Sequence, residues 1–74
     1  ELTPDSAPAL ALRALQLEYD AADPAPVLLH DAQVHPLSSA PRIRLGLLVE
    51  AKNDLASAEK WLLEAARIEA GLAL

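Results

Sequence analysis

The chain has 74 residues, enough for one small domain, and its 53% apolar content argues against intrinsic disorder. A formal net charge of −5, with only six Lys and Arg, argues against a nucleic-acid partner or an anionic membrane partner. The absence of Cys excludes disulfides and thiolate zinc sites. The apolar residues include 16 Leu and 16 Ala but only three Val, two Ile and no Phe, which favours an all-α domain.

Six prolines divide the sequence into four segments that are expected to form helices, since Pro suits a first turn and interrupts a helix interior. The expected helices span residues 8–19 (or 8–21), 24–35, 41–52 and 55–70. Asp5 or Ser6 is the expected N-cap of the first helix, Asp23 precedes the second and Ser39 the third. Gly71 is expected to end the fourth helix as its C′ residue.

The four segments form an internal repeat. Ser6-Ala7-Pro8 recurs as Ser39-Ala40-Pro41 at an offset of 33. With one residue inserted in the turn, Val27-Leu28-Leu29-His30 matches Trp61-Leu62-Leu63-Glu64 at an offset of 34. The sequence therefore predicts a single domain over residues 1–74, with one helix pair over about residues 6–38 and a second over about 39–72. Because the sequence begins with Glu rather than Met, we expect it to be a fragment of a longer protein.

The second unit resembles the tetratricopeptide repeat (TPR), a 34-residue repeat of two antiparallel helices. Leu45-Gly46 matches the Leu-Gly of the family pattern, and Val49 falls at its Tyr position. Further along, Ala58 falls at the first Ala, Leu62 at the aromatic position and Ala65 at the second Ala. The resemblance implies two antiparallel hairpins stacked as a minimal solenoid. It also implies that Gly46 and Ala58 let the two helices of a pair approach closely, and that the small side chain of Ala65 leaves room for the next unit to pack.

The sequence departs from the family pattern at several positions. In the second unit Arg42 stands at the usual Trp position, and Ala70 replaces the closing Pro. The first unit has Leu12-Arg13 in place of Leu-Gly, with Pro24 and Asp31 at the two Ala positions. A divergent first unit is typical of the terminal unit of a repeat array.

The leading helix of each unit is apolar on more than one side, and such a helix must be covered by something. One stripe is assigned to the core: Leu12, Leu15, Leu45 and Val49. The remaining positions fall on the side that lines the concave groove in TPR proteins, and they form the predicted partner-binding face: Leu10, Ala14, Leu17, Ile43, Leu47 and Ala51, flanked by Glu18 and Glu50. The two glutamates favour a partner with Lys or Arg beside its apolar anchors.

The sequence offers little for catalysis, and we expect no enzyme activity, cofactor or metal. It has no nucleophile motif, and two Gly residues do not make a phosphate-binding loop. Asp31 and His35 are four residues apart and are expected to form a local pair on the helix surface. The serines do not resemble the phosphopantetheine site of a carrier protein. Trp61 is expected to pack partly between helices, and Tyr19 to be half-buried with its hydroxyl in water.

The function predicted from the sequence is a non-catalytic protein–protein interaction or docking module that binds a partner peptide or helix. The alternative is a structural homodimerisation or docking domain of a larger multidomain protein or enzyme complex, and further covering helices in a longer chain would also bury the face. No membrane insertion is expected, because the longest apolar runs are about four residues against the ~20 needed to span a bilayer. No signal peptide is expected either.

Overall fold

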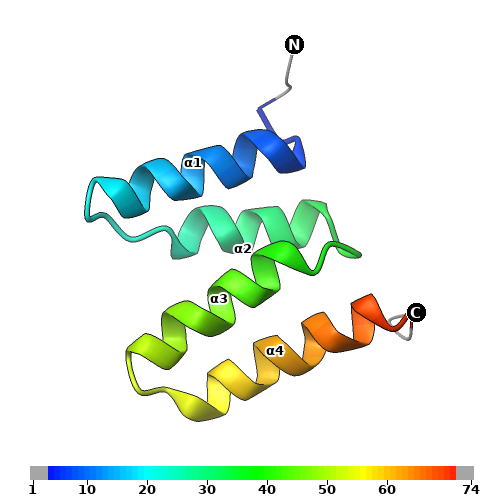
Figure 1. The fold of residues 1–74 in the computed structure, drawn as a ribbon. Helices are drawn as coiled ribbons and strands as arrows, with labels where there is room; N and C mark the ends of the chain where they lie inside the picture. Colours follow the sequence, from blue (N-terminus) through cyan, green and yellow to red (C-terminus); the bar gives the residue numbers. More distant parts are fainter. Residues whose placement is uncertain (1–3, 72–74) are drawn as a thin grey trace.

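The computed structural model describes residues 4–71, and within them it has four α-helices and no strand. The helices are α1 (Ala7–Tyr19), α2 (Ala25–Val34), α3 (Ala40–Ala51) and α4 (Leu55–Glu69). They run alternately in opposite directions and lie side by side in chain order (Figure 1), in a flat array of 31 × 29 × 13 Å. The predicted all-α fold of four helices is confirmed. Leu72, the expected end of the second unit, lies outside the described residues.

Local signals in the sequence account for the ends of α1 and α4. The Oγ atom of Ser6 accepts a hydrogen bond from the Ala9 N–H at 3.3 Å, as expected for the N-cap of α1. At the start of α4, Asp54 Oδ1 accepts a hydrogen bond from the Ser57 N–H at 3.2 Å. Beyond the end of α4, Gly71 has a φ of 75°, the left-handed conformation that a glycine adopts without steric cost.

The other two expected caps have different roles. Asp23 lies one residue before the N-cap of α2, which is Pro24, and its Oδ1 atom accepts a hydrogen bond from the Ala25 N–H at 3.0 Å. Ser39 is the N-cap of α3, but its hydroxyl donates to Glu69 Oε1 at 3.1 Å instead of capping the helix. Ser39 therefore ties the start of α3 to the end of α4.

The centre of the core consists of three buried side chains from successive helices, Ala14, Leu28 and Leu45. Trp61 is partly buried and packs against this cluster, so the expectation that it packs partly between helices is confirmed. Tyr19, expected to be half-buried, is 88% exposed. It lies four residues after Leu15 on the outer side of α1, where no other described helix covers it.

The buried side of α1 is the opposite of the predicted one. Leu10 and Ala14, predicted on the partner-binding face, are 2% and 0% exposed, while Leu12 and Leu15, predicted in the core, are 61% and 49% exposed. The two stripes lie on opposite sides of α1, because residues two or five apart point in different directions on a helix. In α3 the assignment was correct for Leu45, which is 3% exposed, and Val49 is half-buried.

A shift in register between the two hairpins explains the error in α1. The residues that face the neighbouring helices in α1, Leu10, Ala14 and Leu17, correspond in α3 to Arg42, Gly46 and Val49, at an offset of 32 rather than 33. In α2 and α4 the expected offset of 34 holds, because the matched positions Pro24, Asp31, Ala58 and Ala65 are all buried. Residues 52–54 between α3 and α4 are two fewer than residues 20–24 between α1 and α2. The offset nevertheless rises from 32 to 34, because α4 begins ten residues before Ala65 whereas α2 begins six residues before Asp31.

The closest helix approach lies between α3 and α4. A Cβ atom placed on Gly46 would lie 2.8 Å from Leu62 Cγ, well inside van der Waals contact. Ala58 and Ala65, the other small residues of the motif, are each 3% exposed. The expectation that Gly46 and Ala58 permit close packing of this pair is confirmed.

Candidate functional site

The structure retains most of the predicted partner-binding face on α3 but not on α1. Leu10 and Ala14 are buried in the core and Leu17 is half-buried, so these side chains do not form an exposed face. The other predicted residues are exposed: Glu18, Ile43, Leu47, Glu50 and Ala51. Leu47 is 53% exposed, and an exposed leucine points to a binding surface where other exposed apolar side chains adjoin it.

A hollow of about 390 Å³ lies between α1 and α3 on this side of the molecule. Its lining residues are Leu15, Glu18, Arg44, Leu47, Leu48 and Ala51. Arg44 Nη2 donates to Glu18 Oε2, so an ion pair joins the two helices across the hollow. We call this hollow, together with the neighbouring Ile43 and Glu50, the α1–α3 face. Leu15 was missed as a surface residue because the sequence assigned it to the core.

The apolar surface continues from Glu50 onto α4. A second hollow, of about 460 Å³, is lined by Glu50, Leu55, Ala58, Glu59, Leu62, Leu63 and Ala66. Leu55 and Leu63 are both exposed. Neither Glu50 nor Glu59 forms an ion pair with any residue between 4 and 71. This second hollow therefore combines exposed leucines with two glutamates that have no ion-pair partner among the described residues.

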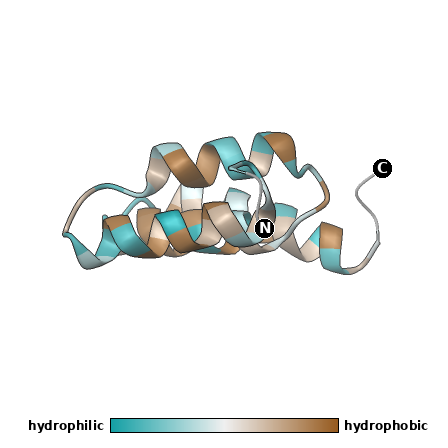
Figure 2. Cartoon of the chain, turned by 90° about the horizontal axis from the view of Figure 1, so that it is seen from above, coloured by the Kyte–Doolittle hydropathy of each residue, from teal (hydrophilic) through white to brown (hydrophobic). Residues whose placement is uncertain are grey.

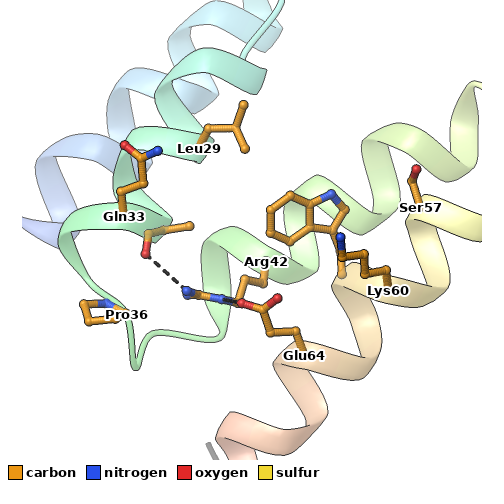
Figure 3. A pocket seen from close by; sticks show the side chains of 9 residues that line it. Leu29, Gln33, Pro36, Arg42, Ser57, Lys60 and Glu64 are labelled. Atoms are coloured by element: carbon orange, nitrogen blue, oxygen red, sulfur yellow. Dashed lines mark hydrogen bonds and ion pairs between the residues drawn. The ribbon is translucent and has the colours of Figure 1, made fainter.

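A third hollow, of about 520 Å³, lies between α2 and α4 (Figure 3). Its lining residues are Leu29, Ala32, Gln33, Pro36, Arg42, Ser57, Lys60, Trp61 and Glu64, and we call it the α2–α4 groove. Arg42 and Ala51 are nine residues apart in α3, which places them about 180° apart around the helix axis. The α2–α4 groove therefore opens on the opposite side of α3 from the α1–α3 face. This groove was not predicted from the sequence.

Arg42, at the base of the groove, is 7% exposed and holds three elements together. Its Nε atom donates to Glu64 Oε1 at 2.5 Å, which links α3 to α4. Its guanidinium donates to the carbonyl of Ser38 at 2.7 Å and to that of Ala32 at 3.1 Å, with a longer contact to the carbonyl of His35 at 3.4 Å. Its charge is thus compensated by one carboxylate and by the carbonyls at the end of α2.

The titratable residues of α2 form a small cluster with Asp5. The expected pairing of Asp31 and His35 is loose, with 3.9 Å between Asp31 Oδ1 and His35 Nε2. Burial raises the pKa of Asp31, and the positive charges of His35, Arg42 and His30 only partly oppose this rise. His30 Nε2 lies 3.0 Å from Asp5 Oδ1, and His35 Nε2 lies 2.7 Å from the Asp5 carbonyl oxygen. Within residues 4–71, no three His, Asp or Glu side chains are arranged to hold a metal ion.

In Figure 2, hydrophobic and hydrophilic residues are interspersed along the helices. Several large apolar side chains are exposed, among them Leu12, Leu37 and Leu55. None of the helices between residues 4 and 71 has the length and apolar character needed to cross a membrane.

Comparisons of the chain with family models, with curated proteins and with solved structures gave no match.

Proposed function

We propose that this chain is a non-catalytic module of helical hairpins, similar in organisation to TPR proteins, that binds a helix or peptide of a partner protein through the α1–α3 face. The observation that carries the proposal is the pair of exposed leucines, Leu15 and Leu47, on either side of a hollow between α1 and α3. Apolar side chains gathered around a concave surface are typical of sites that accept the apolar anchors of a partner.

The repeated burial pattern supports the TPR-like organisation. Ala14 and Gly46 occupy matched places in α1 and α3, and each is a small residue with almost no exposure. Both hairpins thus place a small side chain where the leading helix meets its neighbours. This kind of repetition is what a stacked array of similar units requires.

The charges on this side of the molecule favour a basic partner. Arg44 compensates Glu18, whereas Glu50 and Glu59 have no cationic partner among the described residues. A second copy of the chain docked through the same face brings like charges together, which disfavours the symmetric dimer. A partner helix with Lys or Arg beside Leu or Ile side chains complements both the apolar surface and the two carboxylates.

The test combines a mass measurement with peptide binding. A blocked amphipathic peptide with Leu and Ile on one side and Lys beside them is titrated into the chain, and a matched peptide carries Glu in place of Lys. We expect a monomer in dilute solution that binds the Lys peptide more tightly. Binding should weaken at least tenfold on Leu47→Glu, because a carboxylate then occupies an apolar anchor position. Leu29→Glu, the same change at another exposed leucine, in the α2–α4 groove, is the control and should bind normally.

Three results separate the possibilities. A stable dimer that Leu47→Glu converts to a monomer supports the homodimerisation alternative over peptide binding. Tight binding of the Lys peptide that Leu47→Glu leaves unchanged places the site elsewhere and contradicts the proposal. A monomer that binds neither peptide contradicts it as well.

A further inference from the structure

The α2–α4 groove has features that the proposed function does not use. It lies on the opposite side of α3 from the α1–α3 face, and it is lined by Leu29 and Pro36 of the α2 side and by Trp61 of α4. Trp61 is partly buried in the core and also lines the groove, so one edge of the indole remains available to a ligand. Tryptophan in such a setting is the residue type most enriched among the residues that dominate binding energy.

The charge of the groove is opposite to that of the α1–α3 face. Only three charged residues line it, and two of them, Arg42 and Glu64, neutralise one another. The third, Lys60, is exposed and forms no ion pair with any residue in the range 4–71. In a chain with a net charge of −5, the residues that line this groove thus include one more cation than anions.

The polar groups of the groove fit an extended peptide better than a helix. Gln33 lies on the α2 wall, where its side-chain amide makes no hydrogen bond with any other residue of the described range. An amide presents both a donor and an acceptor, the pair that a free peptide unit needs. A helix satisfies its own backbone groups, whereas an extended peptide leaves them open to side chains of this kind.

From these observations we infer that the α2–α4 groove binds a short extended peptide segment of a partner protein in which a bulky aliphatic side chain lies next to Asp or Glu. The aliphatic side chain packs between Leu29 and Trp61. The carboxylate pairs with Lys60 at the rim, and Gln33 hydrogen-bonds the peptide backbone. Figure 3 shows Leu29 and Gln33 on one wall of the groove and Lys60 on the other, with Arg42 between them. This site is independent of the α1–α3 face and prefers the opposite charge.

Trp61 is the single tryptophan of the chain, so its fluorescence reports directly on the groove. The probes are blocked peptides of Leu, Ile and Pro that contain Asp, Asn or Lys at the same positions and no aromatic residue. We expect the Asp peptide to shift the emission of Trp61 in a saturable manner, the Asn peptide to bind more weakly and the Lys peptide not to bind. The amphipathic Lys peptide that tests the α1–α3 face should leave Trp61 emission unchanged.

Two substitutions at exposed positions locate the site without threatening the fold. Leu29→Glu should weaken binding of the Asp peptide at least tenfold, while Leu47→Glu, its matched control on the opposite face, should not affect it. Lys60→Gln should weaken binding about two- to fivefold and reduce its salt dependence, as expected for a charge at the rim of an interface. Lys52→Gln, at the exposed end of α3 outside the groove, is the control for the loss of one positive charge.

A selection from a random library of displayed peptides removes any dependence on the chosen probe. The inference expects enrichment of aliphatic residues next to Asp or Glu, and loss of the selected peptides on Leu29→Glu but not on Leu47→Glu. It is overturned if nothing is enriched, if basic peptides are enriched at this groove, or if the enriched peptides still bind Leu29→Glu. Because Leu47→Glu tests the other face, failure of this inference and failure of the proposed function give different results.

Discussion

Gly46 lies where α3 and α4 come closest, and replacing it tests that packing directly. The added Cβ of Gly46→Ala would meet Leu62 Cγ at 2.8 Å and Leu62 Cδ2 at 2.9 Å, while its distance of 3.5 Å to the Ala58 carbonyl oxygen is ordinary. Carbon atoms in favourable contact are about 3.5–4.0 Å apart, so the new methyl group overlaps Leu62 by roughly 0.7 Å. Because Cγ is the branch point of Leu62 and not its flexible tip, either its rotamer or the position of α4 must change.

Two effects of opposite sign determine the result. Ala is more favourable than Gly in a helix interior by about 1 kcal/mol. Overpacking of a well-filled contact costs about 1–3 kcal/mol. The net expectation for Gly46→Ala is a destabilisation of about 1 kcal/mol, which lowers the Tm of a domain of this size by about 4–8 °C. Gly46→Leu places three more carbons into the same space and should cost about 3 kcal/mol or more.

Unfolding followed by circular dichroism, in the natural background and in a Leu62→Ala background, measures the effect. Removing the Leu62 side chain removes the clash, so Gly46→Ala should become stabilising by about 1 kcal/mol in that background. Gly71→Ala is the control. It is strained by the φ of 75° and has no neighbour within 4 Å, so its effect should be the same in both backgrounds. If Gly46→Ala stabilises the natural chain, or keeps one sign in both backgrounds, the close approach of α3 and α4 is wrong.

Four further predictions rest on burial and charge. Leu47→Glu should leave helicity and Tm nearly unchanged, whereas Leu45→Glu should unfold the domain, because an unpaired buried charge costs several kcal/mol of a total stability of about 4–11 kcal/mol. Asp31→Asn should stabilise the domain at neutral pH, because burial disfavours the charged carboxylate. This gain should disappear as pH falls through the raised folded pKa of Asp31 toward its unfolded value of 3.8, since the natural side chain is then neutral as well. Asp54→Asn should act in the opposite direction, because hydrogen bonds from Ser57 lower the pKa of Asp54, so its contribution is present at neutral pH and is lost as pH falls below 3.8. Trp61 emission should be blue-shifted in the folded chain and shift to the red in one cooperative unfolding transition, and a solvent-like emission before unfolding would place the indole outside the core.

The sequence was sufficient for the helices because their ends are set by neighbours in the chain. Ser6 and Gly71 act within one turn of the residues that they cap or follow, so their roles were predicted without the rest of the fold. Asp54 caps α4 in the same local way but was not predicted as a cap. The burial of α3 was also largely predictable. Leu45, assigned to the core stripe, is buried, and the positions assigned to the other side of the helix are exposed: Ile43, Leu47 and Ala51.

The burial of α1 could not be fixed by periodicity, because α1 has two apolar stripes. Leu10, Ala14 and Leu17 follow one another at helical spacing, and so do Leu12, Leu15 and Tyr19. The choice depended on the alignment with α3, which used an offset of 33 where the burial pattern gives 32. A shift of one residue turns a helix by about 100° and is enough to exchange the stripes. Ala14 was the available signal, since a small residue in α1 corresponds best to Gly46.

The role of Arg42 was beyond sequence reasoning, because it depends on carbonyls that only the fold brings together. In the sequence comparison with the TPR pattern, Arg42 stood at the position of the usual Trp. Arg42 instead makes directional hydrogen bonds to Ala32 and Ser38. These bonds bind the backbone of the connection between the two hairpins. The position of α2 relative to α3 is therefore determined by hydrogen bonds as well as by side-chain packing. Because Glu64 forms an ion pair with Arg42, Lys60 is the one charged residue lining the α2–α4 groove that has no ion-pair partner among the described residues.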